Sequence, residues 1–163
     1  MRVLVVDDSR SSLAMIVANV KAATTADVDS CLHPVEALLR CAEQQYDLLL
    51  VDHVMPDMDG VEFTRAIRAE ERYRLVPVIM ITSDMDRNIR IEAIRAGASD
   101  FVNKPFDPTE LQARVANLLS LRTAQVELAD RANWLAREVE LATHHLLARE
   151  EEVIWRLARA IEY

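Results

Sequence analysis

The chain has 163 residues, a formal net charge of −8 and a pI near 5.0. This length suits one α/β domain with its own core plus an appendage. The acidic balance argues against nucleic acid as a partner, because nucleic-acid-binding domains carry a basic patch or stripe. No apolar stretch approaches the roughly 20 residues of a membrane span. The apolar run after Met1 is too short for a signal peptide, so we expect a cytoplasmic protein with no membrane partner.

Strand-like apolar runs alternate with helical patterns along the first 120 residues. The runs cover residues 3–6, 28–32, 48–51, 78–81 and 101–102. This alternation favours βαβ units and a parallel sheet. The first helix begins after Asp8 or Ser9, since either residue can cap it. Apolar positions three and four residues apart predict its buried face, which is Leu13, Ile16, Val17 and Val20.

The next three helices each have a start or stop signal. Pro34 opens the second helix, because a proline in the first turn costs little, and we expect this helix to turn three apolar residues inward. Those residues are Val35, Leu38 and Leu39. The third helix follows a loop at residues 55–60, and its predicted core face is Val61, Phe63, Thr64 and Ile67. The fourth covers residues 87–96 and ends at Gly97, which can adopt positive φ.

A long helix closes the chain. Asp107 or Thr109 starts it, because Pro105 and Pro108 block an earlier start, and no Gly or Pro occurs between Thr109 and Tyr163. Apolar or small residues recur close to a heptad pattern at Leu118, Leu121, Leu128, Ala132, Leu135, Val139, Ala142 and Leu146. After a four-residue stutter at Arg149, this seam resumes at Val153, Leu157 and Ile161.

Two interpretations of the seam are open. It could pack against the first domain of the same chain, or it could pair with a second copy as a parallel coiled coil. We favour the homodimer, because a helix of this length cannot bury its whole apolar face on a small domain.

Polar residues follow four of the strand-like runs. Asp7 and Asp8, Asp52, Thr82, and Lys104 each stand where an apolar run ends. Parallel strands place their carboxyl ends along one edge of a sheet, where α/β proteins bind ligands. Three carboxylates, a hydroxyl and an ammonium are therefore expected in one crevice.

Such a crevice suits a divalent metal and a phosphoryl group. Mg²⁺, or Mn²⁺, prefers oxygen ligands. Asp8 and Asp52 could supply them, with Asp7 through water and the backbone carbonyl of Val54. Asp52 could then attack phosphorus as a carboxylate nucleophile. Lys104 would contribute a point charge.

The first 120 or so residues resemble the receiver domain of two-component response regulators. The resemblance rests on VLVVDDS (3–9), LLLVDHVMPDMDG (48–60), VIMITS (78–83) and GASDFVNKPF (97–106). It implies a flavodoxin-like, doubly wound α/β fold with a five-stranded parallel sheet of order 2-1-3-4-5. It also implies that Asp7 and Asp8 bind the metal and that Asp52 accepts a phosphoryl group. The donor would be a sensor histidine kinase or a phosphotransfer domain.

The same resemblance implies a switch beside the acceptor. Thr82 would move toward the phosphoryl group, Phe101 would rotate inward, and Pro105 would carry a cis peptide bond after the lysine. Asp84 is either a helix cap or an influence on dephosphorylation. We expect His53 to point to the opposite face of its strand end, as a core or surface residue without a catalytic role.

The C-terminal segment carries a second, shorter resemblance. AREEEVIWRLARAIEY (148–163) resembles the helix that opens the HD-GYP domain in RpfG-type response regulators. It implies a receiver at residues 1–120 and a helical linker at 121–163, leading to an absent output domain that is a cyclic di-GMP phosphodiesterase. The chain itself would be a phosphoacceptor and not an enzyme.

Other interpretations stay open. The output could be a DNA-binding domain or another enzyme. His144 and His145 suggest a histidine-kinase dimerisation helix, but the acidic residue and proline of that family do not follow them, so we interpret them as solvated. A haloacid-dehalogenase phosphatase also uses Asp, Thr and Lys, although its Asp-x-Asp pattern differs from the adjacent Asp7 and Asp8.

Overall fold

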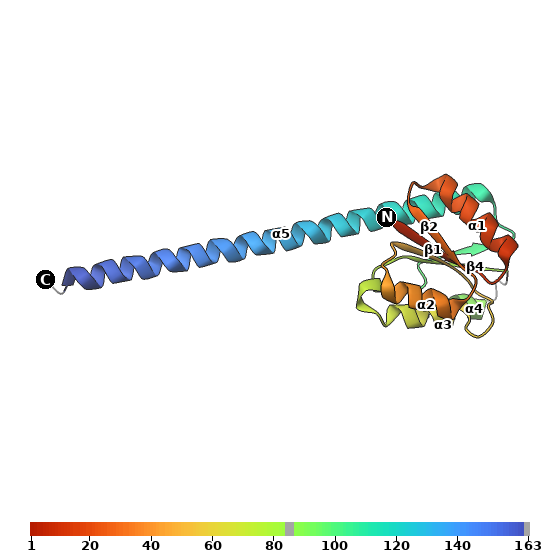
Figure 1. Cartoon of the computed structure of the whole chain (residues 1–163), viewed down its shortest axis with the longest axis horizontal. Helices are drawn as coiled ribbons and strands as arrows, with labels where there is room; N and C mark the ends of the chain where they lie inside the picture. Colours follow the sequence, from red (N-terminus) through yellow and green to blue (C-terminus); the bar gives the residue numbers. More distant parts are fainter. Residues whose placement is uncertain (84–86, 162–163) are drawn as a thin grey trace. The chain divides into compact units, whose positions relative to one another are not determined.

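The computed structural model describes residues 1–83 and 87–161, and its strands form one parallel sheet. In chain order the elements are β1 (Arg2–Val6), α1 (Arg10–Ala23), β2 (Asp27–Cys31), α2 (Pro34–Glu43), β3 (Leu48–Asp52), α3 (Gly60–Arg68), the 3₁₀ turn η1 (Glu71–Tyr73), β4 (Val78–Thr82), α4 (Arg87–Ala96), β5 (Asp100–Asn103) and α5 (Pro108–Ile161). The strand order is β2-β1-β3-β4-β5, as predicted (Figure 1). The flavodoxin-like α/β fold class is therefore confirmed.

Helices cover both faces of the sheet in the first part of the chain (Figure 1). On one face, α1 and the first turns of α5 enclose a cluster that includes Ile16, Val20, Leu111 and Val115. On the other face, α2 and α3 pack on alternate strand residues such as Leu4 and Leu49. β3 and β4 are buried along their whole length, which is why they are continuous apolar runs in the sequence.

One predicted helix face is wrong. Val35 and Leu39 of α2 are 51% and 63% exposed, and only Leu38 of the expected three packs partly on the core. The buried stripe of α2 is instead Pro34, Ala37 and Cys41. These smaller side chains let the helix lie close to the sheet, and their spacing turns the larger apolar residues outward. In α1 and α3 the predicted faces are confirmed, with Val17 only partly buried.

The helix starts resolve the alternatives left open by the sequence. Ser9 is the N-cap of α1, and its side chain accepts from the backbone N–H of Ser12. For α5 the cap is Asp107, whose carboxylate accepts from Thr109 N, with Pro108 as the first helical residue. Gly97 ends α4 at φ 106°, a conformation that favours glycine, as predicted.

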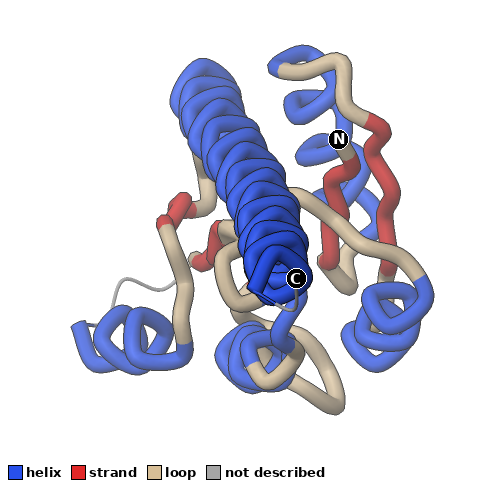
Figure 2. Tube along the Cα trace, turned by 90° about the vertical axis from the view of Figure 1, so that its left-hand side faces the viewer, coloured by secondary structure: helices blue, strands red, loops and turns tan. Residues whose placement is uncertain are grey.

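The chain divides into two compact units, Met1–Arg122 and Thr123–Tyr163. α5 is one unbroken helix of 54 residues (Figure 2). Within the second unit, Leu128, Leu135, Val139 and Leu146 of the heptad seam are all exposed. These residues therefore form an exposed apolar stripe on the second unit. In the part of the chain that the structure describes, no helix is long and apolar enough to cross a membrane.

Candidate functional site

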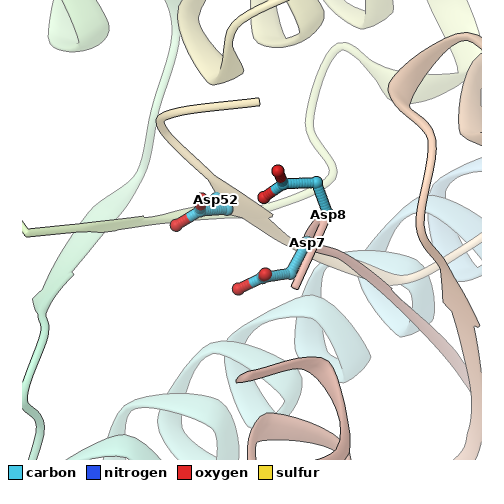
Figure 3. Close-up of side chains that lie close together, drawn as sticks. All are labelled: Asp7, Asp8 and Asp52. Carbon is cyan, nitrogen blue, oxygen red and sulfur yellow. The ribbon is translucent and has the colours of Figure 1, made fainter. Parts of the chain in front are cut away.

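Three carboxylates gather at the carboxyl edge of the sheet. Asp7 and Asp8 follow β1, and Asp52 is the last residue of β3, which lies beside β1. One oxygen of each lies within 4.8 Å of the others, and Figure 3 shows the three side chains together. Asp7 and Asp52 are buried, whereas Asp8 is exposed. The predicted convergence of these residues is therefore present in the fold.

The carboxylate of Asp7 accepts three hydrogen bonds from its neighbours. Its Oδ1 accepts from the backbone N–H of Ser9 at 2.9 Å, and its Oδ2 accepts from Ser12 Oγ at 2.6 Å and from Lys104 Nζ at 2.8 Å. Hydrogen bonds to a buried charge make its burial tolerable and fix its orientation. Ser12 is a site residue that the sequence reasoning missed, because only the phase of α1 relative to β1 brings its hydroxyl to the carboxylate.

Lys104 joins the two buried acids. Its Nζ also lies 2.7 Å from Asp52 Oδ1. Burial raises the pKa of Asp52 above its ordinary value, and the ammonium of Lys104 offsets only part of this effect. Burial lowers the pKa of Lys104, but its hydrogen bonds to Asp52 and Asp7 outweigh that and raise it. The site therefore holds a charged lysine, and the carboxyl group of Asp52 is costly to ionise without a further cation.

The predicted switch residues lie on the two strands beyond Asp52. Thr82 is the buried last residue of β4, and its carbonyl accepts from the backbone N–H of Lys104 at 2.8 Å. Phe101 on β5 is half-buried, and the guanidinium of Arg90 stands 5.3 Å from its ring centroid. The expected cis peptide bond between Lys104 and Pro105 is present. The roles of Thr82 and Phe101 as a switch stay predictions.

The loop after β3 begins at His53. Its side chain is half-buried, and its backbone bonds to Ile81 O and Gly60 N hold the strand end. Gly60 leaves no room for a side chain, because a Cβ there would lie 2.5 Å from the carbonyl oxygen of Asp52. The side chain of Val54 is exposed, and the ligand role of its carbonyl stays a prediction. Asp84 lies outside the described residues.

The donor set fits a hard divalent cation. All three acidic side chains offer oxygen, and carboxylates with room for water are the ligands that Mg²⁺ prefers. Three carboxylates against one ammonium leave an excess of negative charge, which also fits a cation. An additional positive charge would lower the cost of ionising Asp52. Asp8, as the exposed member, would give the ion its access to solvent.

Comparisons with known proteins agree on the family. The response regulator receiver domain model matches residues 3–116. The cyclic di-GMP phosphodiesterase response regulator RpfG of Xanthomonas campestris is 39% identical over 164 residues. That match covers 100% of this chain and only 43% of the relative, so the chain spans less than half the relative's length. The phosphate regulon transcriptional regulatory protein PhoB of Rhizobium meliloti is 32% identical, covering 93% of this chain and 66% of that protein.

A solved structure supports the same assignment. The chemotaxis protein CheY4 of Vibrio cholerae matches with a TM-score of 0.68 and 30% identity. The match covers 72% of this chain and 97% of that chain. Together with the family model, it leads to one conclusion: the chain belongs to the response regulator receiver domain family and is a receiver of two-component signalling.

Proposed function

We propose that the first unit accepts a phosphoryl group on Asp52 from a sensor histidine kinase or a phosphotransfer domain, with Mg²⁺ at the acidic cluster. The observation that carries this proposal is the convergence of Asp7, Asp8 and Asp52 within 4.8 Å of one another, with the ammonium of Lys104 paired to Asp7 and Asp52. Asp8 and Asp52 would hold the cation directly and Asp7 through water. When bound, the cation neutralises the carboxylates and the incoming phosphoryl oxygens.

In this proposal the two oxygens of Asp52 have different tasks. Lys104 lies 2.7 Å from Oδ1, which supports Oδ2 as the oxygen that attacks phosphorus. The bond from phosphorus to the donor's histidine nitrogen breaks, that nitrogen keeps the electron pair, and an acyl phosphate forms on Asp52. Lys104 then pairs with a phosphoryl oxygen. The Thr82 hydroxyl hydrogen-bonds another oxygen, and Phe101 follows by rotating inward.

The output belongs to the same proposal. We propose that α5 pairs with a second copy through its heptad seam and passes the switch to a cyclic di-GMP phosphodiesterase domain. The exposed Leu128, Leu135 and Leu146 support the pairing, and the relative with a phosphodiesterase in its name supports the output. A transcriptional output is the second candidate, favoured by the relative that is a transcriptional regulatory protein. A cytoplasmic location is part of this proposal.

Phosphate chemistry tests the acceptor. Incubated with acetyl phosphate and Mg²⁺, the protein is expected to gain one phosphoryl group, measured by intact mass, while Asp52→Asn gains none. With p-nitrophenyl phosphate, a phosphatase would release p-nitrophenol continuously, and a receiver would not. Sustained turnover, or uptake by Asp52→Asn equal to that of the wild type, would contradict the assignment.

Sedimentation tests the pairing. The full chain is expected to associate with increasing concentration, and a truncation after Leu121 is expected to remain monomeric because it lacks the exposed seam residues from Leu128 onward. Monomeric behaviour of the full chain at high concentration would count against the dimer. Phosphoryl uptake by the truncated protein serves as the folding control.

A further inference from the structure

At the end of the first unit, the buried face of α5 carries a charged residue at a position where an apolar one would be expected. The buried stripe of α5 runs through Leu111, Val115 and Leu119, which pack on the sheet. The next position on this face, three residues on, is Arg122, whose side chain is only 11% exposed. A leucine there would continue the stripe without burying a charge. The arginine therefore needs another explanation than hydrophobic packing.

The partner of Arg122 is Asp47. Arg122 Nε lies 3.8 Å from Asp47 Oδ1, and the Asp47 side chain is 22% exposed. At this distance the two side chains form an ion pair but not a hydrogen bond. The buried Nε of Arg122 has no hydrogen-bond partner among the described residues. Such a pair is a poor source of stability, because neither charge recovers its full desolvation cost. A buried pair of this kind is therefore weak evidence for stability, and a role in orienting the helix is the one to test.

Asp47 connects this pair to the strands of the acidic site. Its Oδ2 accepts from the backbone N–H of Arg2 at 2.9 Å, and its own N–H donates to Arg2 O at 2.7 Å. Arg2 begins β1, which leads to Asp7, and Asp47 immediately precedes β3, which ends at Asp52. Asp52 follows Asp47 by five positions along the strand, a rise of about 16 Å. Arg122 is thus tied to the starting ends of both strands that carry the acids.

We propose that the ion pair of Arg122 and Asp47, the exit latch, is the positioning contact through which phosphorylation of Asp52 sets the pairing of α5 between two copies. This inference rests on the proposed function. Arg122 is the last residue of the first unit. Holding its side chain fixes the rotational phase with which the helix continues, and each residue of a helix advances that phase by about 100°. Because the two charged groups are 3.8 Å apart, a small shift of the strands can shorten or lengthen the distance between them.

The exit latch is tested by linkage between phosphorylation and association. Beryllofluoride with Mg²⁺ serves as the phosphoryl mimic, and sedimentation of the full chain gives the dimer dissociation constant. In the wild type, the mimic is expected to change that constant by roughly fivefold or more. In Arg122→Gln and in Asp47→Asn, which keeps an acceptor for Arg2, the change is expected to fall below about twofold. Both variants should still take up one phosphoryl group on Asp52.

The matched control is Arg137→Gln, which removes an exposed arginine from the second unit and should leave the change as in the wild type. A wild-type response in both Arg122→Gln and Asp47→Asn would overturn the exit latch and leave the proposed function intact. A wild type that takes up the phosphoryl group without any change in association would contradict the proposed relay, and the latch with it.

Discussion

The two units use apolar residues in opposite ways. In the first unit, the strand residues of β3 and β4 are all buried within the chain, and the buried side chains of Asp7, Asp52 and Thr82 stand at the carboxyl edge of the sheet. In the second unit, leucines and valines recur near heptad spacing, and they are exposed. Both units are rich in apolar residues, so the spacing of these residues, and not their number, distinguishes a buried strand from the exposed stripe of α5. The first unit buries its apolar residues in its own core, whereas the second leaves them exposed at the spacing on which the proposed pairing rests.

Matched leucine substitutions should separate the two units most strongly. Leu49→Ala removes a fully buried side chain of β3 and is expected to lower the free energy of unfolding by about 2–5 kcal/mol. Leu128→Ala removes a side chain that is 65% exposed. Its effect on the unfolding of the first unit should stay within about 0.5 kcal/mol, but it should weaken dimerisation. Chemical denaturation and sedimentation measure the two effects. Equal destabilisation of the first unit would break the comparison.

Within the first unit, Ser12→Ala tests whether the acids are held in place. The hydroxyl of Ser12 orients Asp7 at 2.6 Å, so its loss should weaken Mg²⁺ binding by about tenfold, in the range found for outer-shell partners of metal ligands. Calorimetric titration with Mg²⁺ measures the change. Ser11→Ala, an exposed neighbour in the same turn, is the control and should bind as the wild type does. An unchanged affinity in Ser12→Ala would show that Asp7 needs no such support.

The smallest expected effect concerns the stability of the metal-free site. Burial raises the pKa of Asp52, so the folded state binds the proton more tightly than the unfolded chain, and the ionised form costs stability at neutral pH. Asp52→Asn is therefore expected to raise the melting temperature at pH 7 in a chelator. The gain should disappear toward pH 4 and below, where the wild-type carboxyl is protonated too. A lower melting temperature for Asp52→Asn at pH 7 would mean that pairing with Lys104 outweighs burial.

Much of the fold was predictable because it depends on local patterns. Continuous apolar runs marked β3 and β4, and the placement of Asp7, Asp52 and Lys104 after such runs was enough to bring them together once the strands were parallel. The strand ends were misplaced by one residue at Asp52 and Thr82, because the ladder with the neighbouring strand continues through them. That difference depends on pairing, which a single run does not reveal.

The contacts that the sequence did not predict depend on how each helix is rotated about its axis relative to the sheet. Val35 and Leu39 were expected inside because they are large and apolar, but α2 packs by its small residues. Ser12 reaches Asp7 only through the phase of α1. The pair of Arg122 and Asp47 joins residues far apart in the chain, and no local pattern signals it. Size and periodicity place a residue on an element, whereas the rotation of that element decides its neighbours.

The most direct measurement of the central claim is the position of the phosphoryl group. After reaction with acetyl phosphate and Mg²⁺, the protein would be digested and its peptides analysed by mass spectrometry. One phosphoryl group on the peptide that contains Asp52, removed by hydroxylamine as an acyl phosphate, is the predicted result. Phosphorylation confined to any other residue, or a peptide map without phosphate, would contradict the account.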